Sequence, residues 1–214
     1  QPVAALLGGP GGGQRLGAWE PKQYAAEVSR TSDWRRISAD IAGKVRTASA
    51  DLPILISPPA FARTDFLSVM DKPPVSGVVW CVHDYEPRDY THYPRDAAGL
   101  IYFGERDASS FASRIDAVRQ QGVPLFLGEF GASRWLRDID AYYRARIAAC
   151  EARGIGWAAF RWPTSDAAYE RSDDMFNLIW GPNADASGAA ISTLRPAWAK
   201  NTARSGGIDL RGRN

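Results

Sequence analysis

Short runs of apolar residues recur along the chain, and most of them are too short to be helices. They are rich in branched or aromatic side chains and are bounded by Gly, Pro or Asp, which is typical of strands. Because each run is apolar at successive positions, we expect a sheet buried on both faces. Five runs fit this description: Val3–Leu7, Pro53–Ser57, Gly77–Val82, Pro124–Leu127 and Gly156–Trp162.

Amphipathic segments lie between these runs. In the first of them, Ile37, Ile41 and Val45 follow each other at four-residue spacing, which places them on one face of a helix. The alternation of strand and helix predicts an α/β protein with a parallel sheet and covering helices. Three helices are predicted: Trp34–Ala48, Ser109–Gln121 and Ile139–Arg153.

The predicted connections are unequal at the two ends of the strands. The stretches that follow strands, Tyr85–Gly104 and Pro163–Asn183, are long, whereas a return from helix to strand such as Ala50–Leu52 is short. This asymmetry is typical of a TIM (β/α)8-type barrel, whose chemistry lies on one rim. A complete barrel takes about 250 residues, and this chain has 214. We therefore expect a single, partial barrel domain at residues 1–201 and a Gly- and Arg-rich tail at 202–214.

Composition excludes several classes of protein. The chain is 45% hydrophobic and 23% charged, and its formal net charge is +2, with the basic residues spread along its length. This predicts a globular protein without a nucleic-acid groove, and the apolar runs fall far below the roughly 20 residues of a membrane helix. Cys81 and Cys150 lie in no metal-binding spacing, so we interpret both as small buried hydrophobic residues.

Polar side chains that can bind ligands or take part in catalysis follow two of the predicted strands. After the strand at 77–82, residues 83–92 read H-D-Y-E-P-R-D-Y-T-H, and the strand at 124–127 runs into G-E-F-G at 128–131. Ligands bind at the carboxyl ends of strands in parallel α/β proteins. A His, a Tyr and a Glu delivered there in succession therefore predict an assembled site.

These segments resemble glycoside hydrolase family 5, the cellulase-type enzymes. The usual family form after the sixth strand is H-x-Y-x-P-x-x-F-T-H, the G-E-F-G segment is similar to the seventh strand, and G-W-A-A-F-R-W at 156–162 is similar to the eighth. The resemblance covers residues 50 to 182. It implies that the chain holds about the last five β/α units of a barrel, and that Glu129 is the catalytic nucleophile.

The residues themselves agree with retaining glycoside hydrolysis, which needs one carboxylate as nucleophile and another as proton donor. A Glu that ends an apolar strand needs partners, and the phenol of Tyr85 can donate a hydrogen bond to Glu129, the role that the resemblance also gives it. Strand alternation places Cys81, His83 and Tyr85 on one side, so His83 should reach the same pocket. The alternatives are a structural pairing of Glu129 with an arginine and a hydrogen-bonded core role for His83.

Aromatic residues make up 11% of the chain and supply candidate sugar contacts, although most should belong to the core. Phe160 and Trp162 share a strand face, so one of them is expected to be the platform beneath the sugar. His92, which could instead pack down its loop, and Trp80 are further candidates for substrate binding.

Two features depart from the family pattern. The family's fourth strand ends in Asn-Glu-Pro, with the Glu as acid/base, but the comparable segment here carries Gly8 and Gly9. Glu20, before Pro21, is the nearest substitute, and its helix-entry context predicts a capping or surface role. The first three β/α units are also missing. A longer polypeptide, a different packing of the N-terminal residues or another subunit could complete the barrel.

Two functions follow from these observations. The first is a retaining hydrolase of β-glucan-type polysaccharide, and the second is an inactive relative that binds carbohydrate without cutting it. A third hypothesis is a barrel enzyme that acts on an ester or a lipid glycoside. Glycosyl transfer by two carboxylates requires no metal or cofactor, and we expect none. The polymeric substrate favours a secreted or periplasmic protein, and an oligomer is possible if the chain is complete.

Overall fold

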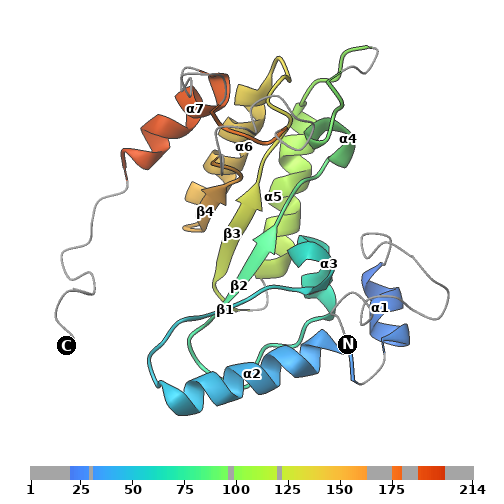
Figure 1. The fold of residues 1–214 in the computed structure, drawn as a ribbon, viewed down its shortest axis with the longest axis vertical. Coiled ribbons are helices and arrows are strands. Elements are labelled where there is room, and N and C mark those ends of the chain that lie inside the picture. Colours follow the sequence, from blue (N-terminus) through green and yellow to red (C-terminus); the bar gives the residue numbers. More distant parts are fainter. Residues whose placement is uncertain are drawn as a thin grey trace.

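The computed structural model describes residues 20–28, 31–95, 99–119, 122–162, 175–179 and 188–200. Within these residues the fold is built on a four-stranded parallel sheet with strand order β1-β2-β3-β4 (Figure 1). The strands are β1 (Ile54–Ile56), β2 (Val78–His83), β3 (Leu125–Phe130) and β4 (Gly156–Ala159). Four of the five predicted strands are thus confirmed, and the fifth, at 3–7, lies outside the described residues.

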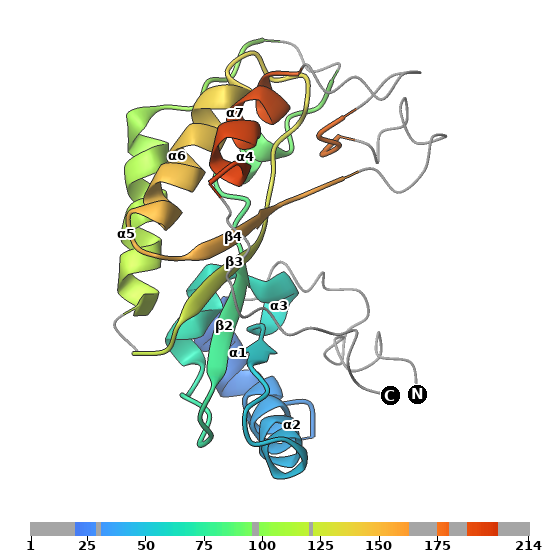
Figure 2. The same ribbon diagram turned by 90° about the vertical axis from the view of Figure 1, so that its left-hand side faces the viewer.

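Helices cover one side of this sheet. In Figure 2 the sheet is seen nearly edge-on, with α5 (Glu105–Arg119) and α6 (Ile139–Glu151) running side by side along it. Helix α7 (Ala189–Trp198) packs on α6, and α2 (Trp34–Ala48) packs near β1. The three predicted helices are confirmed. The shorter elements were not predicted: α1 (Pro21–Glu27), α3 (Pro59–Ala62), η3 (Thr64–Val69), α4 (Arg88–Thr91) and also α7.

Side chains along β2 alternate between the two faces of the sheet. Val78, Trp80 and Val82 are buried under the helices, whereas Cys81 and His83 are half-buried on the other face. Trp80 has no exposed surface, so its assignment to substrate binding is wrong: its place in the strand alternation turns it away from the face of His83. The expectation of buried cysteines holds for Cys150 but not for Cys81.

An irregularity in the pairing of β2 and β3 sets the position of Glu129. Val82 pairs with Leu127, but the next residue, His83, pairs with Glu129, so Gly128 is an extra residue in β3. A side chain at Gly128 would place its Cβ 2.5 Å from the sulfur of Cys81. The bulge therefore requires glycine and brings Glu129 opposite His83.

The sheet is open, with β1 and β4 at its edges in the described part of the chain. Parallel strands in sequential order, each followed by helical structure, form part of the wall of a β/α barrel. The apolar face that a barrel would enclose includes Leu55, which is 54% exposed. No helix among the described residues is long and apolar enough to span a bilayer.

Candidate active site

Glu129 lies near the end of β3. Its carboxylate meets the side chain of His83, the last residue of β2, and that of Tyr85, two residues further along the chain. The hydroxyl of Tyr85 donates a hydrogen bond of 3.0 Å to Oε2 of Glu129. Nδ1 of His83 lies 3.3 Å from the same oxygen, and the carboxylate remains 33% exposed. The predicted Tyr85–Glu129 hydrogen bond and the reach of His83 into this site are both confirmed.

The partners of Glu129 bear on the alternative interpretations. Among the described residues, its carboxylate meets a tyrosine and a histidine, and no arginine pairs with it. His83 is likewise not enclosed in the core, because a quarter of its side chain is exposed. The side chain of Glu129 thus has two described partners and keeps a third of its surface exposed.

Burial and the charge of Glu129 fix the protonation of its two partners. Burial, reinforced by the nearby carboxylate, raises the pKa of Tyr85, so this phenol stays protonated and donates. Burial lowers the pKa of His83, although the carboxylate opposes this shift. A neutral His83 meets the carboxylate favourably only with its proton on Nδ1, which leaves Nε2 as an acceptor.

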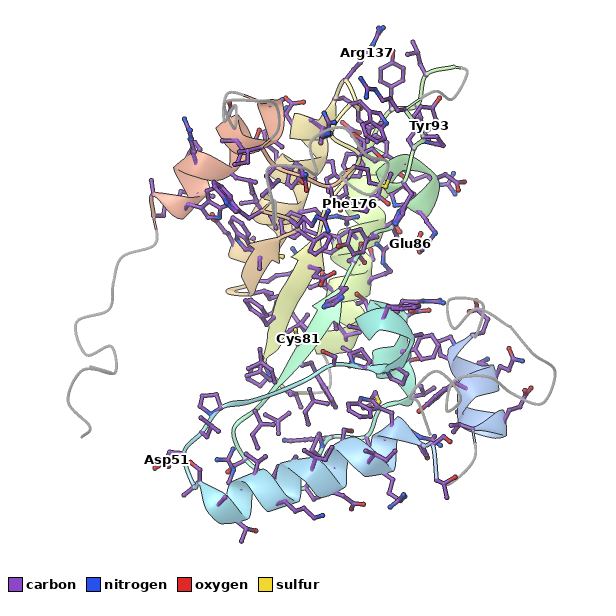
Figure 3. All side chains as sticks on the ribbon, viewed as in Figure 1. Asp51, Cys81, Glu86, Tyr93, Arg137 and Phe176 are labelled. Atoms are coloured by element: carbon purple, nitrogen blue, oxygen red, sulfur yellow. The ribbon has the colours of Figure 1, made fainter. Side chains whose placement is uncertain are left out.

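Aromatic rings form a wall beside Tyr85. The ring of His92 lies 5.6 Å from that of Tyr85, and Phe160 lies 6.5 Å from it, both edge to face. Phe176 contacts all three, with centroids 5.3 Å from Tyr85, 5.0 Å from His92 and 6.0 Å from Phe160 (labelled in Figure 3). Trp162 is 61% exposed. Sequence reasoning located Phe160 and His92 near the site but missed Phe176, which no motif marks.

A buried ion network holds the backbone that carries His83 and Tyr85. Asp84 lies between these two residues, and its carboxylate accepts hydrogen bonds from Arg114 on α5 at 2.9 and 3.0 Å. Arg146 on α6 is fully buried, lies 3.0 Å from the same carboxylate and donates to the carbonyl of Glu86. Sequence reasoning missed this network, although an Asp directly after an apolar strand was a signal for it.

Glu20 occupies the N-cap position of α1, but its side chain makes no capping hydrogen bond. Of the two predicted roles, capping or surface, the structure supports the surface role. The carboxylate is 72% exposed and lies 4.0 Å from Nη2 of Arg63, whose backbone forms a parallel bridge with His83. Glu20 is thus linked through one residue to the strand end that carries the site, and Gly8 and Gly9 lie outside the described residues.

Comparison with known proteins identifies the family. The family model "Cellulase (glycosyl hydrolase family 5)" matches residues 17–166. The chain belongs to glycoside hydrolase family 5. The matched segment contains Glu20, Glu129 and Trp162, whereas Gly8 and Gly9 precede it. No protein of curated function matches the chain significantly.

Solved structures of low sequence identity share the fold. An endoglucanase from Thermotoga maritima is 15% identical with a TM-score of 0.64, covering 82% of this chain and 55% of its own. A lichenase from a Caldicellulosiruptor species is 14% identical with a TM-score of 0.66, covering 88% and 55%. The cellulose synthase subunit Z of Clostridioides difficile is 17% identical with a TM-score of 0.63, covering 81% and 64%. The chain therefore spans between about half and two thirds of these relatives.

Proposed function

We propose that this family 5 chain carries the nucleophile half of a retaining glycoside hydrolase that cleaves β-glucan-type polysaccharide. The observation that carries the proposal is the carboxylate of Glu129, held by Tyr85 and His83 at the end of a parallel strand. An endo-β-1,4-glucanase bound to its substrate and a lichenase bound to cellotetraose are among the structural relatives. These relatives support a β-linked glucan as the substrate class.

The proposed reaction is a double displacement at the anomeric carbon. A carboxylate oxygen of Glu129 attacks that carbon, and the bond to the leaving sugar breaks as a second carboxylic acid protonates its oxygen. The resulting glycosyl ester is then hydrolysed by a water that the second carboxylate deprotonates. The hydrogen bond from Tyr85 keeps the attacking carboxylate oriented, and Nε2 of His83 is available to accept a hydrogen bond from a sugar hydroxyl.

We assign the second carboxylate to Glu20. Three observations support it: the family match contains Glu20, the side chain serves no cap, and Arg63 connects it to the strand of His83. Retaining hydrolysis requires the two carboxylates about 5–5.5 Å apart. Glu20 lines a hollow with Arg114 and Val118 of α5, so this assignment needs a rearrangement of the chain around α1 when substrate binds.

The second candidate function is sugar binding without hydrolysis. The observation that favours it is the exposure of Glu20, whose nearest partner is Arg63 rather than a group of the site. In that case the aromatic wall of His92, Phe160 and Phe176, together with the exposed Trp162, would hold a polysaccharide that is not cut. Either function acts on a polymer outside the cell, so we propose a secreted or periplasmic location.

Hydrolysis of an aryl β-cellobioside with a good leaving group tests both candidates. Glu129→Ala should abolish turnover, and Glu20→Ala should keep the first step but stall at hydrolysis of the glycosyl ester, with azide restoring the rate. Glu27→Ala on the same helix α1 is the matched control and should behave as wild type. An unchanged rate in Glu129→Ala would overturn the proposal. No turnover by the wild type, with cello-oligosaccharide binding retained, would favour the binding protein.

A further inference from the structure

A small cavity opens on the rim beside the candidate active site. Its volume is about 160 Å³, and it lies between the loop that follows β2 and the loop that follows β3. A cavity of this size suits one sugar ring rather than a chain. Figure 3 labels Tyr93 and Arg137 at this end of the molecule. The residues that line the cavity include Tyr93, Arg95, Leu100, Tyr102, Trp135 and Arg137.

The walls of this cavity are fixed to each other by hydrogen bonds between the two loops. The indole N–H of Trp135 donates to the carbonyl of Tyr93 at 2.8 Å. Ser133 donates its hydroxyl to the same carbonyl at 2.9 Å and its backbone N–H to Thr91 at 2.9 Å. Within the first loop, the hydroxyl of Tyr93 donates to the carbonyl of Gly99 at 3.1 Å. A ligand would therefore meet a preformed site and would not have to order it.

The cavity combines aromatic surface with positive charge. Tyr102 is 59% exposed, and the guanidinium of Arg134 lies 5.7 Å from the ring of Trp135. In the described part of the chain, neither Arg95 nor Arg137 forms an ion pair. Unpaired arginines beside exposed rings are suited to a ligand that has both an apolar face and a negative charge.

The acid that follows Arg137 in the sequence is engaged elsewhere. Asp138 follows Arg137 directly, but its carboxylate accepts hydrogen bonds from the hydroxyl of Tyr90 at 2.9 Å and from the backbone N–H of Phe103 at 2.7 Å. Because Tyr90 is buried, these hydrogen bonds of Asp138 stabilise the interior of the loop. Asp138 therefore does not pair with Arg137, whose charge meets no acid among the described residues.

We propose that this cavity binds one acidic sugar residue of a glycan, a site separate from Glu129. The C–H face of the sugar stacks on Tyr102 or Trp135, and Arg137 or Arg95 binds its carboxylate or phosphoryl oxygens. The site adds affinity for acidic glycans, whether or not the chain hydrolyses them. It does not depend on the acid/base assignment.

Calorimetry tests the site with three probes: a β-1,4-linked glucuronic acid tetramer, cellotetraose of equal length, and glucose 6-phosphate. The uronic acid tetramer should bind more tightly than cellotetraose, and its affinity should fall with added salt. Binding of glucose 6-phosphate alone would assign the cavity to phosphorylated sugars, and binding of the tetramer alone would assign it to uronic acids. Equal affinity for the acidic and neutral tetramers, or no binding of either acidic probe, would overturn the proposal.

Variants locate the binding. Arg137→Gln should lower the affinity for the acidic tetramer by at least about tenfold, because one charge-assisted hydrogen bond is lost. Tyr102→Ala should lower the affinity for both tetramers. Arg119→Gln, at the other end of α5, removes the same charge elsewhere and should change nothing. An equal loss in Arg119→Gln would show unspecific attraction and contradict the site. Turnover of the aryl cellobioside in the same samples separates this result from a failure of the proposed hydrolase.

Discussion

Replacing the buried Arg146 by Met should lower the free energy of unfolding substantially. Its guanidinium is fully buried, lies 3.0 Å from the Asp84 carboxylate and stacks 3.9 Å above the ring of Phe111. Removing one partner of a buried pair leaves an uncompensated charge and typically costs about 3–5 kcal/mol. Arg114 still holds Asp84 in the variant, so we expect the lower end, about 3 kcal/mol of the free energy of unfolding.

Urea unfolding followed by tryptophan fluorescence measures this change, with linear extrapolation to water. Arg144→Met on the same helix is the control, because Arg144 is 61% exposed and its one ion pair among the described residues is with Asp140, four residues away. Such a surface pair is worth about 0.3–0.5 kcal/mol. A loss below about 1 kcal/mol in Arg146→Met would show that the buried ion pair contributes little to stability.

The same network predicts a coupling between two sites. Because Arg146 and Asp84 contact each other directly, the combined loss of stability in Arg146→Met with Asp84→Asn should be at least about 1 kcal/mol smaller than the sum of the two single losses. A double variant as unstable as the sum of the two single variants would show that packing on Phe111, and not charge, is the cause.

Three further predictions test the site itself. Tyr85→Phe should keep the fold and lower kcat/KM by about tenfold to a hundredfold, because one hydrogen bond to the carboxylate of Glu129 is lost; activity within twofold of wild type would contradict its role. Gly128→Ala should lower the free energy of unfolding by about 1–3 kcal/mol, because the new methyl meets a sulfur 2.5 Å away, and urea midpoints within error of wild type would exclude that collision. Burial lowers the pKa of both His83 and His92, so the unfolded chain binds more protons and stability should fall as the pH drops through about 6.5. Unfolding at about pH 7.5 and about pH 5.5 checks this, and an increase in stability at the lower pH would reverse the sign.

The sequence predicted the strands and long helices well because their signals are local. Helix α2 was predicted at its observed bounds, 34–48, because its apolar spacing is regular and Asp33 caps it through a 3.0 Å hydrogen bond to the N–H of Arg35. The Tyr85–Glu129 contact was predictable because two adjacent parallel strands end at the same rim. Trp80 was misassigned although its parity with His83 already placed it on the opposite face.

Contacts between distant segments were not predictable from local pattern. Phe176 reaches the aromatic wall from a segment beyond β4, and nothing in its neighbourhood of the sequence marks it. Arg114 and Arg146 occupy ordinary helical positions, and their burial beside Asp84 follows only from how α5 and α6 pack on the sheet. The bulge at Gly128 was not predicted because it depends on the register with β2.

Covalent trapping tests the central claim most directly. A dinitrophenyl 2-deoxy-2-fluoro-β-cellobioside carries a leaving group that needs little protonation, so it should form a stable glycosyl ester even with an impaired acid. We predict that mass spectrometry of the digested protein finds one fluorosugar on the peptide that contains Glu129, and none in Glu129→Gln. A label on another carboxylate would contradict the account, as would rapid hydrolysis of natural substrate with inversion at the anomeric carbon.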